Sequence, residues 1–381
     1  MPDPLETARA LRGLIESEAQ LVEEKCTMTP AVVDALVESG LFRLLVPKAY
    51  DGLEADVASI VDVCEELSFA DGSVGWAFAQ NTTVMGYAAY LTAEFAVPLA
   101  KARAAAGMFA PLGVAHREEG AFRISGNYPF GSGCAHAEFM GGSAMVMENG
   151  EMAPFVNGLP QMIAFIVPVE RVILKGNWDT MGLRGTGSFD FEVPEQKVDP
   201  GATFSVFNAE TIVGGAIYGI GAIVLGTISS AAWALGVANR ALYEIAEIGK
   251  GGRTRLGSLP LVEQVAFQRD YGIHQTAVKA ARLLLCQAYQ SAVDAVAERA
   301  SADIYAERIR ETKAASSYVT RVAKAAVSFA WESSGSAGMR NPNRLQRCFR
   351  DIHVGSGHQV FDERNYNELA KPSLGLDPAP Y

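Results

Sequence analysis

Cysteine and histidine are both scarce in this chain of 381 residues, which has five of each. The cysteines are far apart and none forms a CxxC pair, so the sequence predicts neither a zinc site nor a disulfide framework. The first twenty residues are acidic and amphipathic and contain no apolar signal core. Together with the unpaired cysteines, this favours a reducing compartment, and we expect a cytoplasmic protein.

Positive charge is also limited. The chain has 32 Lys and Arg against 43 Asp and Glu, a net charge of -11, and no run of basic residues. Nucleic acids and anionic membrane surfaces attract basic faces. We therefore expect neither nucleic acid nor membrane as a partner.

One segment, residues 214–239, has no charged residue and is long enough to cross a bilayer. It is rich in Gly, Ala and Ser and lacks basic flanks, whereas a helix buried on all sides is also uniformly apolar. We therefore predict a buried core helix. Its "GIGAIVLG" has Val224 where a dinucleotide motif needs glycine, and no predicted strand precedes it, so that motif is excluded.

The first hundred residues have helical periodicity. Apolar residues recur every three or four positions from Leu5 to Val22. A second helix should begin after Thr29, with Pro30 in its first turn, and end near Gly40. Two more helices are expected on either side of the Asp71-Gly72 break.

Residues 107–198 differ in composition, with short segments rich in β-branched and aromatic residues. In "SFDFEVPEQKV", apolar and acidic residues alternate as in a half-buried strand. From residue 207 the pattern is helical again, with "GKGGRTRLGSLP" as a break between two long helices. The order predicts an α+β, mainly α, fold: an N-terminal helical domain (1–106), a central β-barrel-like domain (107–205) and a C-terminal four-helix bundle (206–381).

The stretch "RDIHVGSGHQVFDERN" contains two histidines, His353 and His358. They could be a metal pair, a catalytic base with a neighbour, or ordinary polar residues. Metal ligands on a helix need i,i+4 spacing, and these two are five apart, with Gly355 and Gly357 making a regular helix doubtful. We expect no metal and a structural role for His353.

Longer segments resemble a known family. "LFRLLVPKAYDG" and "WDTMGLRGTGSFDFEVPEQKV" resemble the acyl-CoA dehydrogenase superfamily, and the likeness covers nearly the whole chain. Within it, "FAPLG", "YPFGSGCAHAEFMGG", "GLRGTGS" and "FRDIHVGSGH" are similar to the reduced-flavin-dependent, two-component aromatic monooxygenases such as phenolic-steroid hydroxylase. The resemblance implies the acyl-CoA dehydrogenase fold and a homotetramer.

Two positions separate the branches of that superfamily. The dehydrogenases need a glutamate base, but the corresponding positions are Gln359 and the surroundings of Gly226, without a carboxylate. An amide cannot abstract a proton. The hydroxylases carry a histidine seven residues after the aspartate that Asp351 matches, and His358 stands there.

The resemblance implies two catalytic residues. His358 would deprotonate the substrate, since the pKa of an imidazole lies near working pH. Ser132 would hydrogen-bond the flavin near N5, its small hydroxyl acting as a donor that stabilises a C4a-hydroperoxide. A structurally bonded or solvent-facing histidine, and a serine that forms a β-turn, are the ordinary alternatives.

The resemblance also implies binding residues. Those expected at the flavin are Phe109, Ala110, Leu112, Gly113, Phe130, Gly131, Ser132, Gly133 and Arg253. The "FAPLG" segment, Phe109 to Gly113, is expected to be a turn along the flavin ring. Arg253 is a candidate for the flavin phosphate and is equally consistent with a solvated loop arginine. Those expected at the substrate are Trp76, Asn81, Thr82, Met85 and His358. Two departures, Ala135 in place of an acid and Val84 near the place of a helical histidine, leave the substrate open.

The function expected from the resemblance is the oxygenase component of a two-component flavin-dependent monooxygenase that hydroxylates a phenolic or heteroaromatic small molecule. Its cofactor would be reduced flavin, FADH2 rather than FMNH2, its co-substrate O2, and its partner a separate NAD(P)H:flavin reductase. The alternatives are an acyl-CoA dehydrogenase with an atypical base and a non-catalytic flavin-fold binding protein.

Overall fold

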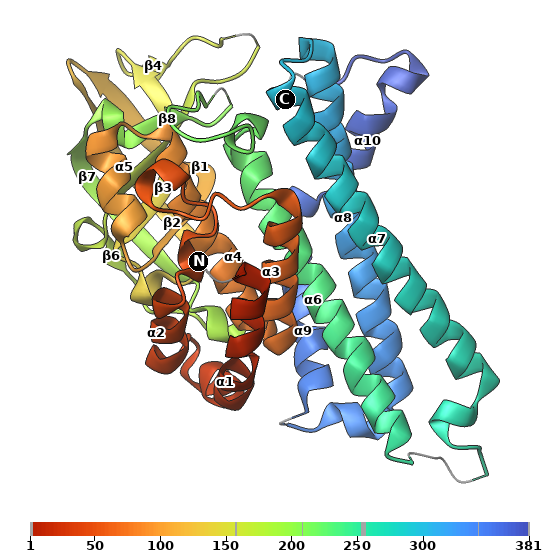
Figure 1. Ribbon diagram of the computed structural model, residues 1–381. Coiled ribbons are helices and arrows are strands. Elements are labelled where there is room, and N and C mark those ends of the chain that lie inside the picture. Colours follow the sequence, from red (N-terminus) through yellow and green to blue (C-terminus); the bar gives the residue numbers. More distant parts are fainter. Residues whose placement is uncertain (1–2, 157, 208, 253–256, 342, 380–381) are drawn as a thin grey trace.

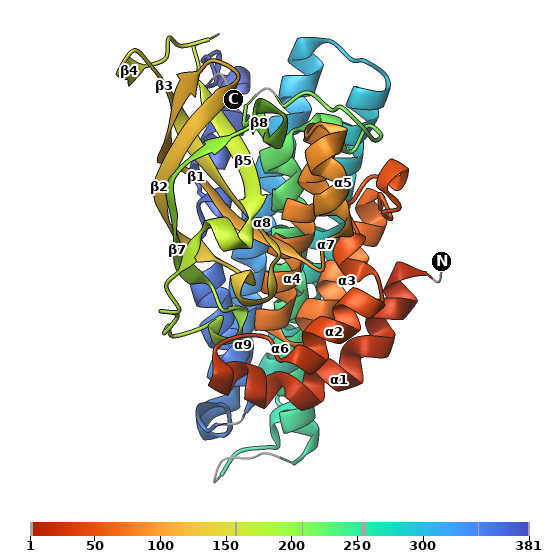
Figure 2. The same cartoon turned by 90° about the vertical axis from the view of Figure 1, so that its left-hand side faces the viewer.

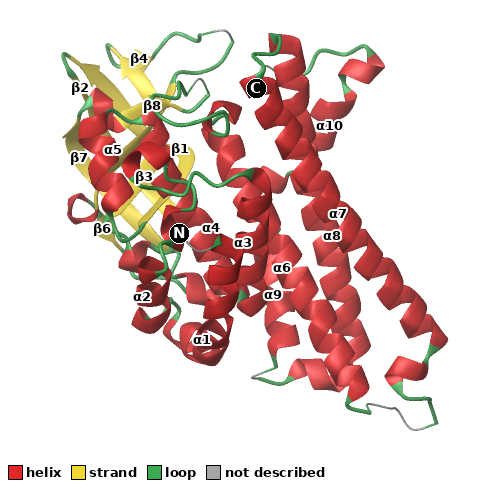
Figure 3. Cartoon of the chain, in the orientation of Figure 1, coloured by secondary structure: helices red, strands yellow, loops and turns green. Residues whose placement is uncertain are grey.

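The computed structural model describes residues 3–156, 158–207, 209–252, 257–341 and 343–379. Short N-terminal helices, a β-sheet and a set of long C-terminal helices form its three parts (Figure 1). The strands gather on one side of the molecule and the long helices on the other (Figure 3). Figure 2 shows the sheet from its side, with the N-terminal helices below and beside it.

The N-terminal part is helical, as the periodicity predicts. Its helices are α1 (Pro4–Lys25), α2 (Pro30–Glu38), α3 (Val57–Ala70), α4 (Gly72–Gly86) and α5 (Ala93–Lys101). The Thr29 side chain caps α2. Asp71 separates α3 from α4, and its carboxylate accepts hydrogen bonds from the backbone N–H groups of Ser73 and Val74. These groups have no partner within the helix, so the cap fixes where α4 begins.

The strands lie where the β-rich composition predicts. They are β1 (Ala105–Glu118), β2 (Ala121–Gly131), β3 (Phe139–Glu148), β4 (Glu151–Met152), β5 (Met162–Pro168), β6 (Ile173–Leu174), β7 (Phe189–Val198) and β8 (Thr203–Ser205). The order in the sheet is β6-β7-β2-β1-β3-β5-β8, and β4 pairs with β3. The domain limits at residues 106 and 205 remain a prediction.

The "FAPLG" segment is not a turn, contrary to our expectation. It lies inside β1, where the register with β3 shifts on both sides of Pro111. Proline has no N–H for the ladder, and a bulge accommodates it. The Phe109 carbonyl within this bulge accepts a hydrogen bond from the Ser143 hydroxyl at 2.6 Å.

The C-terminal part consists of α6 (Ala222–Lys250), α7 (Val265–Ala297), α8 (Ala302–Ser334), α9 (Arg344–Gly355) and α10 (Arg364–Ala370). Helix α6 carries the charge-free segment and is long and apolar enough to span a membrane, but 83% of its most apolar window is buried inside the protein. The predicted buried core helix is confirmed. It packs closely on α3, since a Cβ at Gly236 would lie 2.3 Å from the Glu65 carbonyl oxygen.

Helix α9 carries the first of the two histidines but not the second. It continues through His353 to Gly355 and ends before Gly357 and His358, so no regular helix joins the two histidines, as the glycines suggested. Gly355 is needed for packing, because a Cβ at this position would lie 2.2 Å from the Trp233 ring on α6. The helix ends against α6, and His358 follows as the first residue outside the 3₁₀ turn Gln359–Phe361.

Candidate functional site

Helix α4 positions Ser132, which follows β2. The indole Nε1 of Trp76 donates to the Ser132 hydroxyl at 3.2 Å. Asn81, also on α4, donates from its amide to the Ser132 carbonyl at 3.0 Å. Ser132 is only 5% exposed, so both its side chain and its backbone are held by one helix.

The same indole contacts the second predicted catalytic residue. The rings of Trp76 and His358 meet edge to face, with centroids 5.7 Å apart. On another side, Trp76 packs against Trp233 of α6 at 4.8 Å. The structure therefore brings Ser132 and His358, which are distant in sequence, together around one tryptophan.

His358 has a defined proton arrangement. The backbone N–H of Val360 donates to its Nδ1 at 3.3 Å. Burial lowers the pKa of His358 to about 4, so the ring is neutral at neutral pH. A neutral imidazole carries one proton, which must then be on Nε2. In this form His358 offers a hydrogen-bond donor, and the base role, which needs a free ring nitrogen, remains a prediction that this geometry disfavours.

Two hydroxyl groups lie behind Ser132. Its Oγ is 2.7 Å from the Oγ of Ser188, which is 2.6 Å from the Oγ1 of Thr186. The Thr186 hydroxyl donates to the Leu183 carbonyl at 2.8 Å. The sequence alone did not reveal this hydroxyl chain. The alternating hydroxyl residues of "GTGS" are its signal, but only the fold brings them to Ser132.

Exposed aromatic surface adjoins Ser132. Phe130 is 55% exposed and has a positive φ of 64°, which a bulky residue seldom adopts. Its ring packs edge-on against Trp178 at 6.1 Å, and the Trp178 indole donates to the Leu183 carbonyl at 2.9 Å. Aromatic surface beside buried polar groups suits a flat, partly polar ring such as a flavin.

The two glycines beside Ser132 differ in what they do. Gly131 is buried within β2. Gly133 has φ of 75°, and a Cβ there would lie 2.4 Å from the Asn81 amide oxygen. Gly133 therefore allows α4 to pack closely against the chain beside Ser132.

The predicted flavin residues of β1 divide between surface and interior. Leu112 is exposed and Ala110 partly so. Phe109 packs edge-on against Tyr87 at 5.0 Å. Gly113 is buried, since a Cβ there would lie 2.0 Å from the Tyr128 hydroxyl. Residues 110–112 therefore keep surface for a ligand, and Gly113 does not.

The predicted flavin-phosphate residue, Arg253, falls outside the described residues.

Three predicted substrate residues are in the protein interior. Asn81, Thr82 and Met85 have no exposed surface. The Asn81 amide oxygen pairs with His136 Nε2 at 2.9 Å, and Thr82 donates to the Phe42 carbonyl at 3.3 Å. The structure does not bring these residues to a surface that a substrate could touch. Asn81 belongs to the scaffold that holds Ser132, and Thr82 and Met85 belong to the packed interior around α4.

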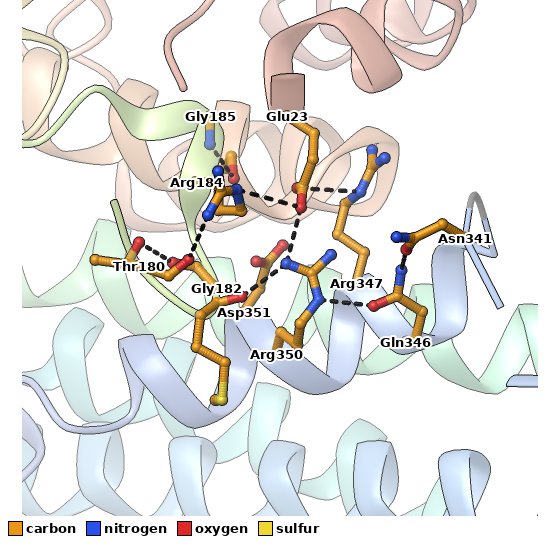
Figure 4. A network of polar contacts seen from close by, with 12 residues as sticks. Glu23, Thr180, Gly182, Arg184, Gly185, Asn341, Gln346, Arg347, Arg350 and Asp351 are labelled. Atoms are coloured by element: carbon orange, nitrogen blue, oxygen red, sulfur yellow. Dashed lines mark hydrogen bonds and ion pairs between the residues drawn. The ribbon is translucent and has the colours of Figure 1, made fainter. Parts of the chain in front are cut away.

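A buried charged cluster supports both halves of the site (Figure 4). Asp351 on α9 accepts a hydrogen bond from the Leu183 N–H at 2.6 Å. Arg350 donates to the Met181 carbonyl at 2.7 Å and pairs with Glu23 of α1 at 2.8 Å. The segment that carries Thr186 and Ser188 is thereby tied to the helix that precedes His358.

The electrostatics of this cluster are unusual. Burial, reinforced by the negative charge of Asp71, raises the pKa of Asp351 to about 7. Arg347 compensates part of the negative charge through its ion pair with Asp71 at 3.1 Å. Asp351 therefore keeps its proton to a higher pH than an ordinary carboxyl group, and its Oδ2 is buried without a hydrogen-bond partner.

The residues around Trp76 form no metal site, and the cavity described below lies elsewhere in the molecule. The described ranges contain no group of three His, Cys, Asp or Glu side chains placed to hold a metal ion. A cavity of about 360 Å³ lies at another part of the sheet, near Arg117, Gln161 and Phe204, and its lining includes none of the predicted site residues.

Comparisons with known proteins agree with this architecture. Residues 6–103 match the N-terminal domain of acyl-CoA dehydrogenases and residues 228–363 match the C-terminal domain. The chain belongs to the acyl-CoA dehydrogenase family.

Relatives of the chain include monooxygenases. The chain is 27% identical to the indole-3-acetate monooxygenase of Pseudomonas putida, covering 92% of this chain and 88% of the relative. It is 26% identical to the flavin-dependent monooxygenase, oxygenase subunit HsaA, of Rhodococcus jostii, covering 96% and 97%.

Solved structures share the fold. XiaF from Streptomyces sp. in complex with FADH2 and glycerol superposes with a TM-score of 0.88 at 20% identity, covering 99% of this chain and 96% of that one. TdsC from Paenibacillus sp. A11-2 in complex with FMN and indole superposes with a TM-score of 0.80 at 20% identity, covering 99% and 98%.

Proposed function

We propose that this chain is the oxygenase component of a two-component flavin-dependent monooxygenase that hydroxylates an aromatic small molecule. The observation that carries the proposal is the contact of one indole, Trp76, with both Ser132 and His358. The monooxygenase relatives support the same reaction. A dehydrogenase is disfavoured because Gln359 stands at one glutamate position and Asp351 is engaged with the Leu183 backbone.

Reduced flavin is the cofactor that the site residues fit. Phe130 supplies exposed aromatic surface for a flat ring, and Ser132 and His358 supply polar groups beside it. Bound reduced flavin would supply the activation of O2 and the transfer of one oxygen atom. FADH2 is our choice, supported by the FADH2 complex of XiaF, although TdsC holds FMN.

The protein contributes position and exclusion of water. The Trp76 indole contacts both polar groups and itself packs against the buried ring of Trp233, so buried aromatic side chains hold the two groups in position. The low pKa of His358 keeps its ring neutral, so that Nε2 can donate a hydrogen bond to an oxygen atom of the reaction. Preorganised groups of this kind act without reorganisation during the reaction.

The proposal includes a reductase and a homotetramer. The oxygenase-subunit name of the HsaA relative supports a separate NAD(P)H:flavin reductase. Exposed apolar side chains on α7, among them Ile273 and Leu283, and Leu374 near the C-terminus are surface that further copies of the chain could cover. A cytoplasmic location also remains part of the proposal, supported by the free cysteines.

The test compares two reactions of the purified chain, hydroxylation of aromatic compounds and desaturation of acyl-CoA thioesters. With chemically reduced FAD, O2 and indole-3-acetate or simple phenols as probes, we expect hydroxylated product by mass spectrometry. With acyl-CoA thioesters of several chain lengths and an artificial electron acceptor, we expect no desaturation. Desaturation without hydroxylation would establish the dehydrogenase instead.

A further inference from the structure

The hydrogen bonds behind Ser132 run in a single direction. The Thr186 hydroxyl is 2.8 Å from the Leu183 carbonyl oxygen, which can only accept, so Thr186 donates its one proton there. The 2.6 Å contact between Thr186 and Ser188 must then be made by the proton of Ser188. Because that proton is used, Ser188 has none to offer Ser132.

The same reasoning fixes the proton of Ser132. Its 2.7 Å contact with Ser188 needs one proton, and only the Ser132 hydroxyl can provide it. The Trp76 indole is a donor only and fills one lone pair of the Ser132 oxygen at 3.2 Å. Ser132 keeps one free lone pair and no free proton. Thr186 and Ser188 are 0% and 2% exposed, so water cannot exchange with these partners.

We infer that Trp76, Ser188 and Thr186 are positioning residues that make Ser132 a hydrogen-bond acceptor toward its ligand, so that the site selects reduced over oxidised flavin. The inference rests on the proposed function and on the resemblance that places Ser132 beside N5. Reduced flavin carries a hydrogen on N5, whereas oxidised flavin has only a lone pair there. An acceptor bonds the first and repels the second, which replaces the donor role that the sequence suggested for Ser132.

The experiment measures the dissociation constants of oxidised FAD, by fluorescence titration, and of reduced FAD, by anaerobic ultrafiltration, and takes their ratio. Ser188→Ala removes the acceptor of the Ser132 proton, which can then turn to the ligand. Thr186→Val releases the Ser188 proton toward Ser132. We expect each to lower the preference for reduced FAD about tenfold, the value of one hydrogen bond.

Matched variants control for fold. Thr186→Ser keeps the hydroxyl and should keep the wild-type ratio. Ser316→Ala removes a buried hydroxyl between α7 and α8, where Ser316 contacts Tyr289, and should also keep it. If Ser188→Ala does not fold, the pair Thr186→Val and Thr186→Ser decides the question.

The outcomes separate the inference from the proposed function. An unchanged ratio in Ser188→Ala and Thr186→Val, with a lowered ratio in Ser132→Ala, would overturn the fixed proton direction while leaving Ser132 at the flavin. A wild type that binds both forms equally but hydroxylates would overturn the selectivity alone. A wild type that binds neither form would overturn the proposed function, and the inference with it.

Discussion

At the scale of the residue, hydrogen-bond direction matters as much as residue type. The sequence identified Ser132 and His358 but could not show which group donates. That information comes from partners elsewhere in the chain: Trp76 on α4 for Ser132 and the Val360 N–H for His358. Asn81 shows the converse: the sequence suggested a substrate-binding residue, but its amide group makes all its hydrogen bonds to other groups of the protein.

The donor role of His358 is tested by substitution. Glutamine can place an amide N–H near the position of Nε2 but cannot act as a base. We expect His358→Gln to retain most product formation and His358→Ala to lose about tenfold or more, measured as product per reduced flavin consumed. His353→Gln, on α9 away from Trp76, is the control and should match wild type. Equal losses in the Gln and Ala variants would instead support the base role.

The low pKa of His358 predicts a pH profile. The folded-state pKa lies below the ordinary value of 6.5, so the unfolded chain takes up a proton first as the pH falls. The stability contributed by the neutral ring is present above pH 6.5 and lost as the pH falls toward 4. The rate of hydroxylation should therefore not change between pH 6 and 7 through ionisation of His358, and wild type and His358→Gln should have the same pH dependence in this range. A step in that range, absent from the variant, would contradict the low pKa of His358.

At the scale of the element, α9 and the segment that precedes β7 act as one unit because Asp351 and Arg350 bond its backbone. The sequence predicted the helices of the N-terminal part because caps and apolar spacing are local. It did not show that α9 extends as far as Gly355, and it misjudged the "FAPLG" segment of β1, because both depend on neighbours: Gly355 packs against Trp233, and Pro111 is accommodated by a register shift.

The ionisation of Asp351 should be visible in stability. Its folded-state pKa of about 7 exceeds the ordinary value of 3.8 for an aspartate, so its contribution to stability is present below pH 4 and lost as the pH rises to about 7. Asp351→Asn keeps an oxygen for the Leu183 N–H and does not ionise. We expect the free energy of unfolding of wild type to fall relative to this variant by about 1–2 kcal/mol between pH 5 and 7.

Urea titrations at several pH values measure this difference. Asp351→Ala is the companion variant: it leaves the Leu183 N–H buried without a partner and should cost about 1–3 kcal/mol at every pH. A difference between wild type and Asp351→Asn that does not change with pH would show that Asp351 ionises normally.

At the scale of the whole molecule, the order of helices, sheet and helices was predictable because composition changes along the chain follow it. The assembly of the site was not, since α4, the end of β2 and the segment after α9 meet only in three dimensions. The apolar side chains that α7 leaves exposed, including Ile273 at 57% and Leu283 at 59%, are consistent with the proposed tetramer.

Light scattering coupled to size exclusion tests that assembly. We expect a mass of four chains of 40.6 kDa. Leu283→Glu should shift the protein to smaller species, because a charge in an apolar interface is costly to bury. The matched change Leu259→Glu, at an exposed leucine before α7, is the comparison. A monomer in the wild type would contradict the tetramer.

The proposed function requires that oxygen transfer take place at the site built around Trp76. The most direct measurement is a single turnover of the wild type with chemically reduced FAD and ¹⁸O2, with indole-3-acetate and phenols as probes and Ser132→Ala and His358→Ala beside it. Our account predicts one labelled oxygen atom in the product of the wild type, and hydrogen peroxide in its place in both variants. Unlabelled product, or reoxidation without product for every probe, would contradict it.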